Sequence, residues 1–437
     1  MRAYERFITY AKIHTASSEE FVQNPSTERQ FDLARLLVKE LQELGVKDAR
    51  VSDKCYVYGS LPATTGHENA PKLGFIAHMD TIPDFSGENV KPTLVHDYDG
   101  GDIPLGDSGR VLSPKDFPSL LELKGKTLIT TDGTTVLGGD DKAGVAEIMT
   151  LVERLQQGDI PHGFIGVAFT PDEEIGHGPD GFDVKGFGCD FGYTLDGGKA
   201  GEIEFENFNA CAAKVTIHGR NVHPGAAKDV MINALQVAME LNGLLPGAER
   251  PEHTDMYEGF FHLNSLEGSV EKATLSYIVR DHSAPRFDSR KATLRQIEAF
   301  LNEKYGPSTV EIALRDQYRN MVEKIRPDNY HLIENAIAAC EQAGVKPIIQ
   351  PIRGGTDGAT LSFMGLPCPN LGTGGYAFHG PFEHVCVEEM DQCVQIALNL
   401  VKAYCSHSRA IPSFPSQLEW KTGLAWANTR GSLNSPS

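Results

Sequence analysis

The sequence predicts an α/β fold, in which a mainly parallel sheet covered by helices is interrupted by an inserted ferredoxin-like α+β domain. Two observations support this. Short apolar strands alternate with helices over the first 200 residues or so of the 437-residue chain, an order typical of parallel sheets with helices on their faces. From residue 207 the order becomes β-α-β-β-α-β, that of a ferredoxin-like sandwich, and after residue 320 the alternation resumes. The predicted domains are 1–207 with 321–408, the insertion 208–320, and a tail at 409–437.

The individual elements follow from hydrophobic spacing. Residues 27–44 place six apolar side chains at helical spacing, and short apolar runs predict strands at 56–61, 73–79 and 163–170. The stretch from 84 to 123 is rich in Gly, Pro and Asp and long for a connection, which is typical of a functional or mobile loop. The other predicted helices are 144–155, 231–245, 290–305, 329–343 and one from 388, and the other strands are 191–195, 212–218, 259–266, 273–280, 309–315 and 346–351.

The composition of the chain limits its possible binding partners and indicates its cellular compartment. A formal net charge of -19 argues against nucleic acid or an anionic membrane as a partner. Charges interrupt the apolar residues of the first twelve positions, so no signal-peptide core is present, and no apolar run approaches the roughly 20 residues that span a bilayer. The eight cysteines form no Cys-x-x-Cys pair, which indicates free thiols in a reducing cytoplasm. We therefore expect a cytoplasmic protein.

The last segment differs from the rest of the chain. From about residue 409 it is rich in Ser, Pro and Asn, lacks periodicity, and holds both tryptophans, Trp420 and Trp426. A disordered appendage or a cloning-derived extension is expected there, with a docking tail that uses the tryptophans as the alternative.

Histidine and acidic residues gather at the predicted strand ends. His78-Met79-Asp80 ends the strand 73–79, and strand alternation puts His78 and Asp80 on one side, where the imidazole can bind a metal and the carboxylate can orient it. An ordinary polar strand end is the alternative. Asp140 and Asp141 lie between glycines directly before a helix, where paired carboxylates suit a cation better than a core. Alone, that stretch also fits a solvated helix N-cap.

Three more segments add similar residues. Glu173-Glu174 follows the strand 163–170, and adjacent carboxylates repel unless a cation or a shared proton relieves them. A solvated acidic loop is the alternative. Asp196 follows the strand 191–195 and His379 lies in a glycine-rich loop, where each alone is usually a turn residue. Because ligand sites of parallel sheets lie beyond the carboxyl ends of the strands, the set together indicates a site for Zn, Mn or Co, with Asp140 placed to bridge two ions.

These motifs make the sequence resemble the tripeptide aminopeptidases of the aminoacylase-like dinuclear zinc metallopeptidase family, over roughly residues 1–407. The resemblance implies two zinc ions per subunit, with His78 and Asp196 on one ion, Glu174 and His379 on the other, and Asp140 bridging them. The motifs that carry it are His78-x-Asp80, Gly139-Asp140-Asp141-Lys142, Pro171-Asp172-Glu173-Glu174, Asp196-Gly197 and Gly375-x-x-x-His379.

The same resemblance implies the catalytic roles. Asp80 would clamp the imidazole of His78, Glu173 would be the general base, and the peptide bond after Asp140 would be cis. The expected reaction releases the N-terminal residue from tripeptides. Two zinc ions would activate a water, and Glu173 would accept its proton and deliver it to the leaving amine.

By resemblance the larger domain is catalytic and the insertion is a lid. His223, Asn233 and Arg280 of the lid would close over the substrate and stabilise the oxyanion or bind a carboxylate. Arg353 is another candidate for the free carboxylate of the peptide, through its bidentate fork. For Arg280, a strand-end surface charge is the alternative. The expected partners are short peptides, and whether the lid also mediates a homodimer stays open.

Three rival functions remain to be separated. The first is a related N-acyl amino acid hydrolase or a carboxypeptidase that uses the same metal set. The second is a non-catalytic metal-binding protein, against which the Glu173 base beside the ligand Glu174 weighs. A serine-nucleophile hydrolase is disfavoured because the chain lacks a Gly-x-Ser-x-Gly elbow.

Overall fold

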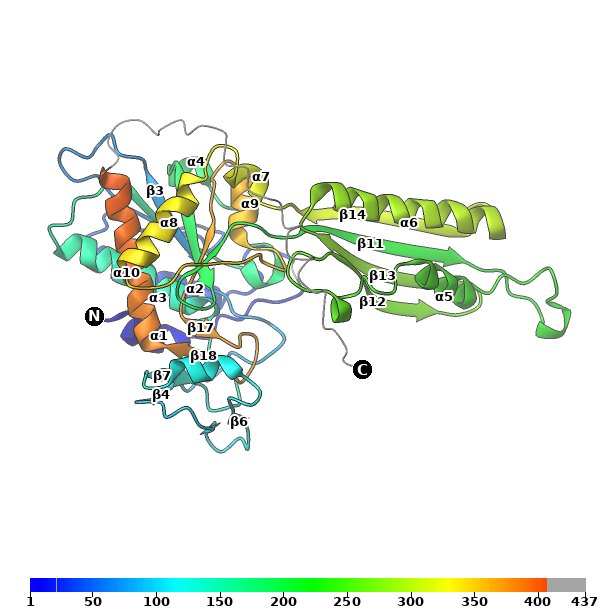
Figure 1. The fold of residues 1–437 in the computed structure, drawn as a ribbon, viewed down its shortest axis with the longest axis horizontal. Coiled ribbons are helices and arrows are strands. Elements are labelled where there is room, and N and C mark those ends of the chain that lie inside the picture. Colours follow the sequence, from blue (N-terminus) through cyan, green and yellow to red (C-terminus); the bar gives the residue numbers. More distant parts are fainter. Residues whose placement is uncertain (21, 407–437) are drawn as a thin grey trace, which may run out of the picture.

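The chain folds into a larger unit and a smaller one that projects from it (Figure 1). A computed structural model describes residues 1–20 and 22–406. The tail predicted at 409–437 lies outside these residues. No helix in the described part is long and apolar enough to cross a membrane.

The larger unit is built on an eight-stranded sheet in the order β1-β2-β8-β3-β9-β16-β10-β15. Its four central strands β8, β3, β9 and β16 run parallel, while β2 and β10 pair antiparallel with their inner neighbours. The prediction of a mainly parallel α/β sheet is therefore confirmed. The strands are β1 (Arg50–Val51), β2 (Val57–Leu61), β3 (Leu73–His78), β8 (Ile165–Thr170), β9 (Phe191–Gly197), β10 (Glu202–Glu204), β15 (Ile348–Ile349) and β16 (Asn370–Gly372).

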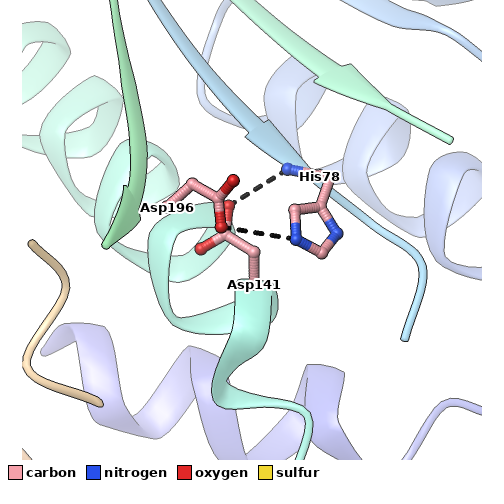
Figure 2. Close-up of side chains that lie close together, drawn as sticks. All are labelled: His78, Asp141 and Asp196. Atoms are coloured by element: carbon pink, nitrogen blue, oxygen red, sulfur yellow. Dashed lines mark hydrogen bonds and ion pairs between the residues drawn. The ribbon is translucent and has the colours of Figure 1, made fainter. Parts of the chain in front are cut away.

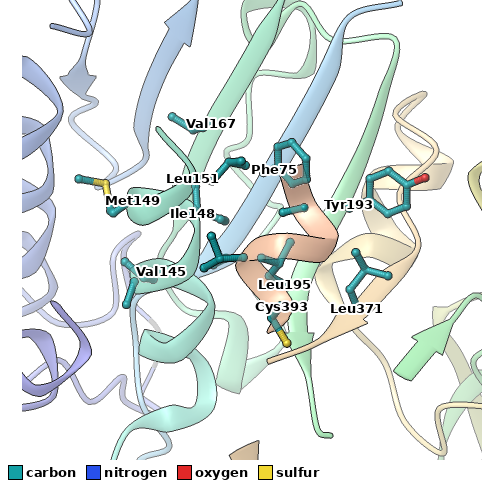
Figure 3. Packing of buried hydrophobic residues seen from close by; sticks show 14 of the residues in the cluster. Phe75, Val145, Ile148, Met149, Leu151, Val167, Tyr193, Leu195, Leu371 and Cys393 are labelled. Atoms are coloured by element: carbon teal, nitrogen blue, oxygen red, sulfur yellow. The ribbon is translucent and has the colours of Figure 1, made fainter. Parts of the chain in front are cut away.

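Helices cover both faces of this sheet, as the near-continuous apolar strands require. Phe75 and Val167 face one core, whereas Ile76 and Ala168, the next residues of the same strands, face the other. Figure 3 shows the first core, where α3 packs on the strands. The helices of the first face are α1 (Ala3–Ala11), α2 (Gln30–Glu43), α3 (Gly139–Gln157), α8 (His331–Gln342) and α10 (Val387–Ser406), and those of the second are α4 (Val184–Phe187) and α9 (Asp357–Phe363).

Helix α1 is absent from the sequence prediction. It has only nine residues, too few for a clear periodic signal, yet Phe7 and Tyr10 are fully buried in the first core. Full burial of a side chain such as that of Phe7 stabilises the fold by about 1.5–3 kcal/mol. The packing of α1 against α3 and α10 therefore fixes it where propensity alone would not.

The smaller unit has the predicted ferredoxin-like topology. Its strands β11 (Asn209–His218), β12 (Phe260–Gly268), β13 (Lys272–Asp281) and β14 (Val310–Tyr318) form an antiparallel sheet in the order β12-β13-β11-β14. Helices α5 (Ala234–Leu244) and α6 (Ala284–Tyr305) pack on it. Helix α6 begins six residues before the predicted start at 290, because Ser283 caps it and a proline occupies the first turn. The exact domain limits stay a prediction.

The long stretch after residue 84 contributes one strand, β4, to a small sheet that was not predicted. Its strands have only two or three residues, in the order β17-β18-β7-β4, and they connect segments far apart in the chain. Strand β7 lies ten residues before Asp140, while β17 and β18 flank His379. The small sheet therefore joins two loops that carry predicted site residues. The strands are β4 (Thr93–Val95), β7 (Leu128–Thr130), β17 (Gly375–Tyr376) and β18 (His384–Cys386).

One buried acid in the first core has no evident role in the site. Glu147 of α3 is fully buried, and neither carboxylate oxygen has a hydrogen-bond partner among the described residues. Burial first, and then the charge of Asp391 on α10, raise the pKa of Glu147 well above its ordinary value of 4.5. The contribution of protonated Glu147 to the free energy of unfolding is therefore fully present below about pH 4.5. It is lost as the pH rises through the raised pKa of this side chain.

We expect Glu147→Met to stabilise the protein by about 1–3 kcal/mol at neutral pH, because it removes a buried polar group that nothing satisfies. Chemical denaturation at pH 5 and pH 8 measures this, with the larger gain at pH 8. The control is Glu153→Gln on the same helix, which loses the ion pairs of Glu153 with Arg6 and the N-terminal amine and gives no gain. Equal stability of Glu147→Met and the parent at both pH values would contradict the assignment.

Candidate active site

The predicted site lies beyond the carboxyl ends of the central strands, where parallel sheets bind ligands. His78 ends β3, Glu173 and Glu174 follow β8, and Asp196 lies near the end of β9. A cavity of about 370 Å³ opens at this edge. Its lining is Asp140, Glu173, Glu174, Gly176, Pro179, Asp196, Glu204, Tyr318, Ile352, Gly355, Thr356, Asp357, Thr360, Asn370 and His379.

His78 lies at the centre of one half of the site. Its Nε2 is 2.9 Å from Asp140 Oδ1, 3.4 Å from Asp196 Oδ1 and 3.7 Å from Glu173 Oε2. The imidazole is almost completely buried. Figure 2 shows Asp196 pointing at the ring, while Asp141 accepts the backbone N–H of His78 at 3.1 Å. A buried nitrogen that faces three carboxylates fits a cation ligand.

His379 forms the other half. Its Nε2 lies 3.0 Å from Asp140 Oδ2 and 3.1 Å from Glu174 Oε2. The backbone of His379 is left-handed, with φ 67°, in the glycine-rich loop between β17 and β18. The two oxygens of Asp140 therefore face two different histidines, the arrangement that a bridging ligand needs.

Asp80 contacts residues of both halves of the site. Its Oδ1 lies 3.3 Å from His78 Nδ1, on the side of the ring opposite to Asp140. Its two oxygens also accept the backbone N–H groups of Glu173 at 3.0 Å and Glu174 at 3.2 Å. The buried carboxylate thus fixes the turn that carries the two glutamates and lies against the imidazole, whose Nδ1 is also 3.1 Å from the backbone oxygen of Asp80.

The Asp140 loop is held by Glu383, which lies four residues after His379. One Glu383 oxygen accepts the N–H groups of Leu137 and Gly138 at 2.7 and 2.9 Å, and the other accepts that of Asp140 at 2.9 Å. Gly138 is left-handed with φ 81°, and the peptide bond between Asp140 and Asp141 is cis, as the resemblance implies. The backbone of Asp140 itself is not helical, with φ -87° and ψ 99°, and its side chain faces the two histidines.

The protonation of these groups reflects crowded negative charge. Burial, followed by the charge of Asp140, raises the pKa of Glu174 to about 8, and burial raises that of Asp196 to about 6. Hydrogen bonds to Asp140 and Glu174 raise the pKa of His379 to about 10. Burial opposes ionisation of Asp140, but hydrogen bonds from His379 and His78 outweigh it and lower the pKa of Asp140. Nearby cations would lower the pKa values of the carboxyls.

The donor set fits a pair of divalent cations. Two groups each bring potential ligand atoms within 4.8 Å of one another: His78 with Asp140 and Glu174, and His78 with Asp141 and Asp196. Glu174 Oε1 is buried without a hydrogen-bond partner among the described residues, so one lone acceptor stays free for a ligand. Imidazole and carboxylate donors without thiolate suit Zn, Mn or Co.

The four predicted substrate-binding residues do not line the cavity. His223 is exposed in the loop after β11, and Asn233 caps α5 by accepting from Leu235 and Gln236. The Arg280 guanidinium lies over Tyr318, which does line the cavity. Their predicted roles stay a prediction.

Arg353 already has partners in this conformation. Its guanidinium donates to the backbone oxygens of Met256 at 2.8 Å and Glu258 at 2.9 Å, and to Thr254 Oγ1 at 3.0 Å. The side chain thus joins the larger unit to a loop of the smaller one. Its predicted contact with the peptide carboxylate requires these bonds to break, and that role also stays a prediction.

Several residues of the site were given no specific role in the prediction. Asp141 accompanies Asp140 in the same motif, and Asp357 belongs to the glycine-rich segment after Arg353, so each had a local signal. For Glu383, the only signal was that it lies four residues after His379 in the sequence. Glu204 had none, because a glutamate at the end of a three-residue strand resembles any surface acid.

The sequence is similar to those of known peptidases. Residues 205–309 match the peptidase dimerisation domain family. Peptidase T of Alkaliphilus oremlandii is 52% identical over 403 residues, covering 92% of this chain and 98% of the relative. Peptidase T of Clostridium perfringens is 54% identical over 404 residues, covering 92% and 99%.

Solved structures share the fold. Aminopeptidase PepT from Bacillus cereus superposes with a TM-score of 0.74 at 23% identity, covering 92% of this chain and 98% of that one. A dinuclear metal-binding peptidase of the M20 family from Bacillus subtilis gives a TM-score of 0.60 at 14% identity, covering 92% and 99%.

The parallel sheet, the inserted domain that matches the peptidase dimerisation family and the histidine–carboxylate site together indicate a peptidase, which is a hydrolase. The two peptidase T relatives, which are 52% and 54% identical over 92% of this chain, narrow the class further. The chain belongs to the peptidase T family. The resemblance inferred from the motifs and the predicted peptidase activity are confirmed.

Proposed function

We propose that the protein is a zinc-dependent tripeptide aminopeptidase. The observation that carries the proposal is the position of Asp140, whose two oxygens face His78 and His379 with the Glu173 carboxylate beside them. The peptidase T names of the relatives support the activity. The proposed ligands are His78 and Asp196 for one ion, Glu174 and His379 for the other, and Asp140 for both.

Glu173 is the proposed general base. No hydrogen bond among the described residues engages its side-chain carboxylate, while its backbone is fixed by Asp80. When bound by these residues, a zinc pair would supply Lewis-acid polarisation of the scissile carbonyl and would lower the pKa of a water. Glu173 accepts the proton of the attacking water and passes it to the leaving amine, so that the peptide bond breaks and the N-terminal residue leaves as a free amino acid.

The smaller unit is the proposed lid and dimerisation element. The match of residues 205–309 to a peptidase dimerisation domain supports a homodimer. The proposed lid spans 208–320, and its His223, Asn233 and Arg280 would reach the substrate when it closes. Arg353 would then exchange its contacts with Met256 and Glu258 for the peptide carboxylate. The proposed compartment is the cytoplasm, in keeping with eight free cysteines.

A substrate panel with chelation tests this function. We expect hydrolysis of free tripeptides to exceed that of dipeptides and N-acyl amino acids, to stop after dialysis against a chelator, and to return with Zn²⁺. The panel reads the first product by mass, because an aminopeptidase releases the N-terminal residue and a carboxypeptidase the C-terminal one. Preference for N-acyl amino acids would replace the proposal by the related hydrolase. Turnover that survives complete metal removal would overturn the metal mechanism.

A further inference from the structure

One carboxylate of the cavity belongs to neither metal half. Glu204 ends β10 and is half-buried. Its Oε2 accepts Asn370 Nδ2 at 2.8 Å, and its Oε1 is 3.3 Å from Gln350 Nε2. Two amide donors therefore fix the carboxylate while it lines the same cavity as Asp196. Because each carboxylate oxygen has two lone pairs, acceptor capacity is left for a ligand.

Asn370 sets the distance between Glu204 and the candidate metal centre. The same Nδ2 that bonds Glu204 donates to the backbone oxygen of Asp196 at 3.1 Å. Asp196 in turn lies 3.4 Å from His78 Nε2. In a peptide the α-amino nitrogen lies only about 2.5 Å from the carbonyl carbon of the same residue. A group that binds the N-terminal amine must therefore lie next to the centre, as Glu204 does.

Glu204 also lacks a charged partner. Among the described residues no Lys, Arg or His nitrogen forms an ion pair with it, and the histidine that lines the cavity, His379, is paired with Asp140 and Glu174. Glu206, two residues further, is different: it binds Arg326 and the hydroxyl of Tyr257. A carboxylate in a cavity without a counter-charge is costly unless a bound cation satisfies it.

Asp357 is the other cavity carboxyl outside the proposed ligands and base, and its surroundings differ from those of Glu204. It is nearly fully buried, and Thr170 Oγ1 donates to its Oδ2 at 2.8 Å. Gly178 packs so closely on the carboxylate that a Cβ there would overlap both oxygens. Both residues line the cavity, but the Asp357 carboxylate is the more enclosed and already accepts a hydroxyl, which leaves Glu204 more accessible to an ammonium group.

We propose that Glu204, held by Asn370, binds the α-ammonium group of the substrate and so restricts the site to peptides with a free N-terminus. This inference rests on the proposed aminopeptidase function and names the group that recognises the amine. The fixed carboxylate would accept a charge-assisted hydrogen bond from the ammonium. An N-acylated peptide offers no positive charge, so it leaves Glu204 unpaired in the filled cavity and binds weakly.

The test compares Glu204→Gln with the parent on a free tripeptide and on its N-acetyl form, with metal content measured in both proteins. Loss of one charge-assisted bond is expected to lower kcat/KM for the free tripeptide about 10- to 100-fold, mainly through a higher KM. For the acetylated peptide kcat/KM is expected to stay within about twofold, because that peptide makes no such bond. The ratio of kcat/KM for the free tripeptide to kcat/KM for the acetylated one therefore falls in Glu204→Gln. The Glu204→Asp variant is expected to restore part of this ratio.

The matched control is Glu206→Gln, which removes the same charge two residues away, outside the cavity lining, and leaves the ratio unchanged. An equal fall for both peptides in Glu204→Gln, with an unchanged ratio, would overturn the ammonium contact. So would an unchanged kcat/KM on the free tripeptide. If the parent hydrolyses no free tripeptide, the proposed function fails instead, which a parent activity measurement identifies before any variant is made.

Discussion

The Glu173→Gln variant is expected to lose tripeptide hydrolysis by about 10²–10⁴-fold while it keeps its metal, because an amide cannot accept the proton of the attacking water. Gln has nearly the size and shape of Glu, and the backbone N–H of residue 173 still bonds Asp80. The fold and the neighbouring turn should therefore persist. Steady-state kinetics measure the loss, and metal analysis of the same sample measures retention of the ions.

Two further measurements make this result specific. The loss should appear in kcat with little change in KM, because a proton transfer is completed only in the transition state. Glu174→Gln, the adjacent residue, is the matched comparison: its carboxylate bonds His379 at 3.1 Å, so its replacement should lower metal content as well as activity. Near-normal turnover in Glu173→Gln would remove Glu173 from the role of base.

Local patterns in the sequence pointed to residues that the structure brings together, although each pattern alone also had another interpretation. Strand alternation placed His78 and Asp80 on one side, and the structure puts Asp80 Oδ1 3.3 Å from the His78 ring. Flanking glycines singled out Asp140, and Gly138 adopts the left-handed backbone that only such a residue takes easily. These signals are visible because each depends on a few consecutive residues.

Contacts between distant segments could not be predicted in the same way. Glu383 accepts backbone N–H groups from a loop 246 residues earlier, and backbone amides have no sequence signature. The small sheet with β7 and β18 was missed because strands of three residues carry too little pattern. The positions of the four proposed substrate-binding residues depend on how the smaller unit is held, for example by Arg353 on Met256 and Glu258.

The Asp140→Asn variant is expected to lose both metal and activity, which contrasts with Glu173→Gln. Asp140 presents one oxygen to each histidine, and an amide offers one oxygen and one nitrogen that carries hydrogens. One of the two cation positions then meets a non-ligating nitrogen, and the shared negative charge is gone. Because a metal supplies several kcal/mol of transition-state stabilisation, kcat should fall by at least about 10³-fold.

Metal analysis after gel filtration separates this result from a folding defect. The expected content in Asp140→Asn is one ion or fewer per subunit, with a circular dichroism spectrum like that of the parent. The Glu173→Gln protein serves as the control, since it also loses one carboxylate of the cavity but should retain both ions. Full metal content in Asp140→Asn would contradict the bridging role. If each oxygen of Asp140 binds a different cation, replacing one oxygen by nitrogen must weaken the binding of metal.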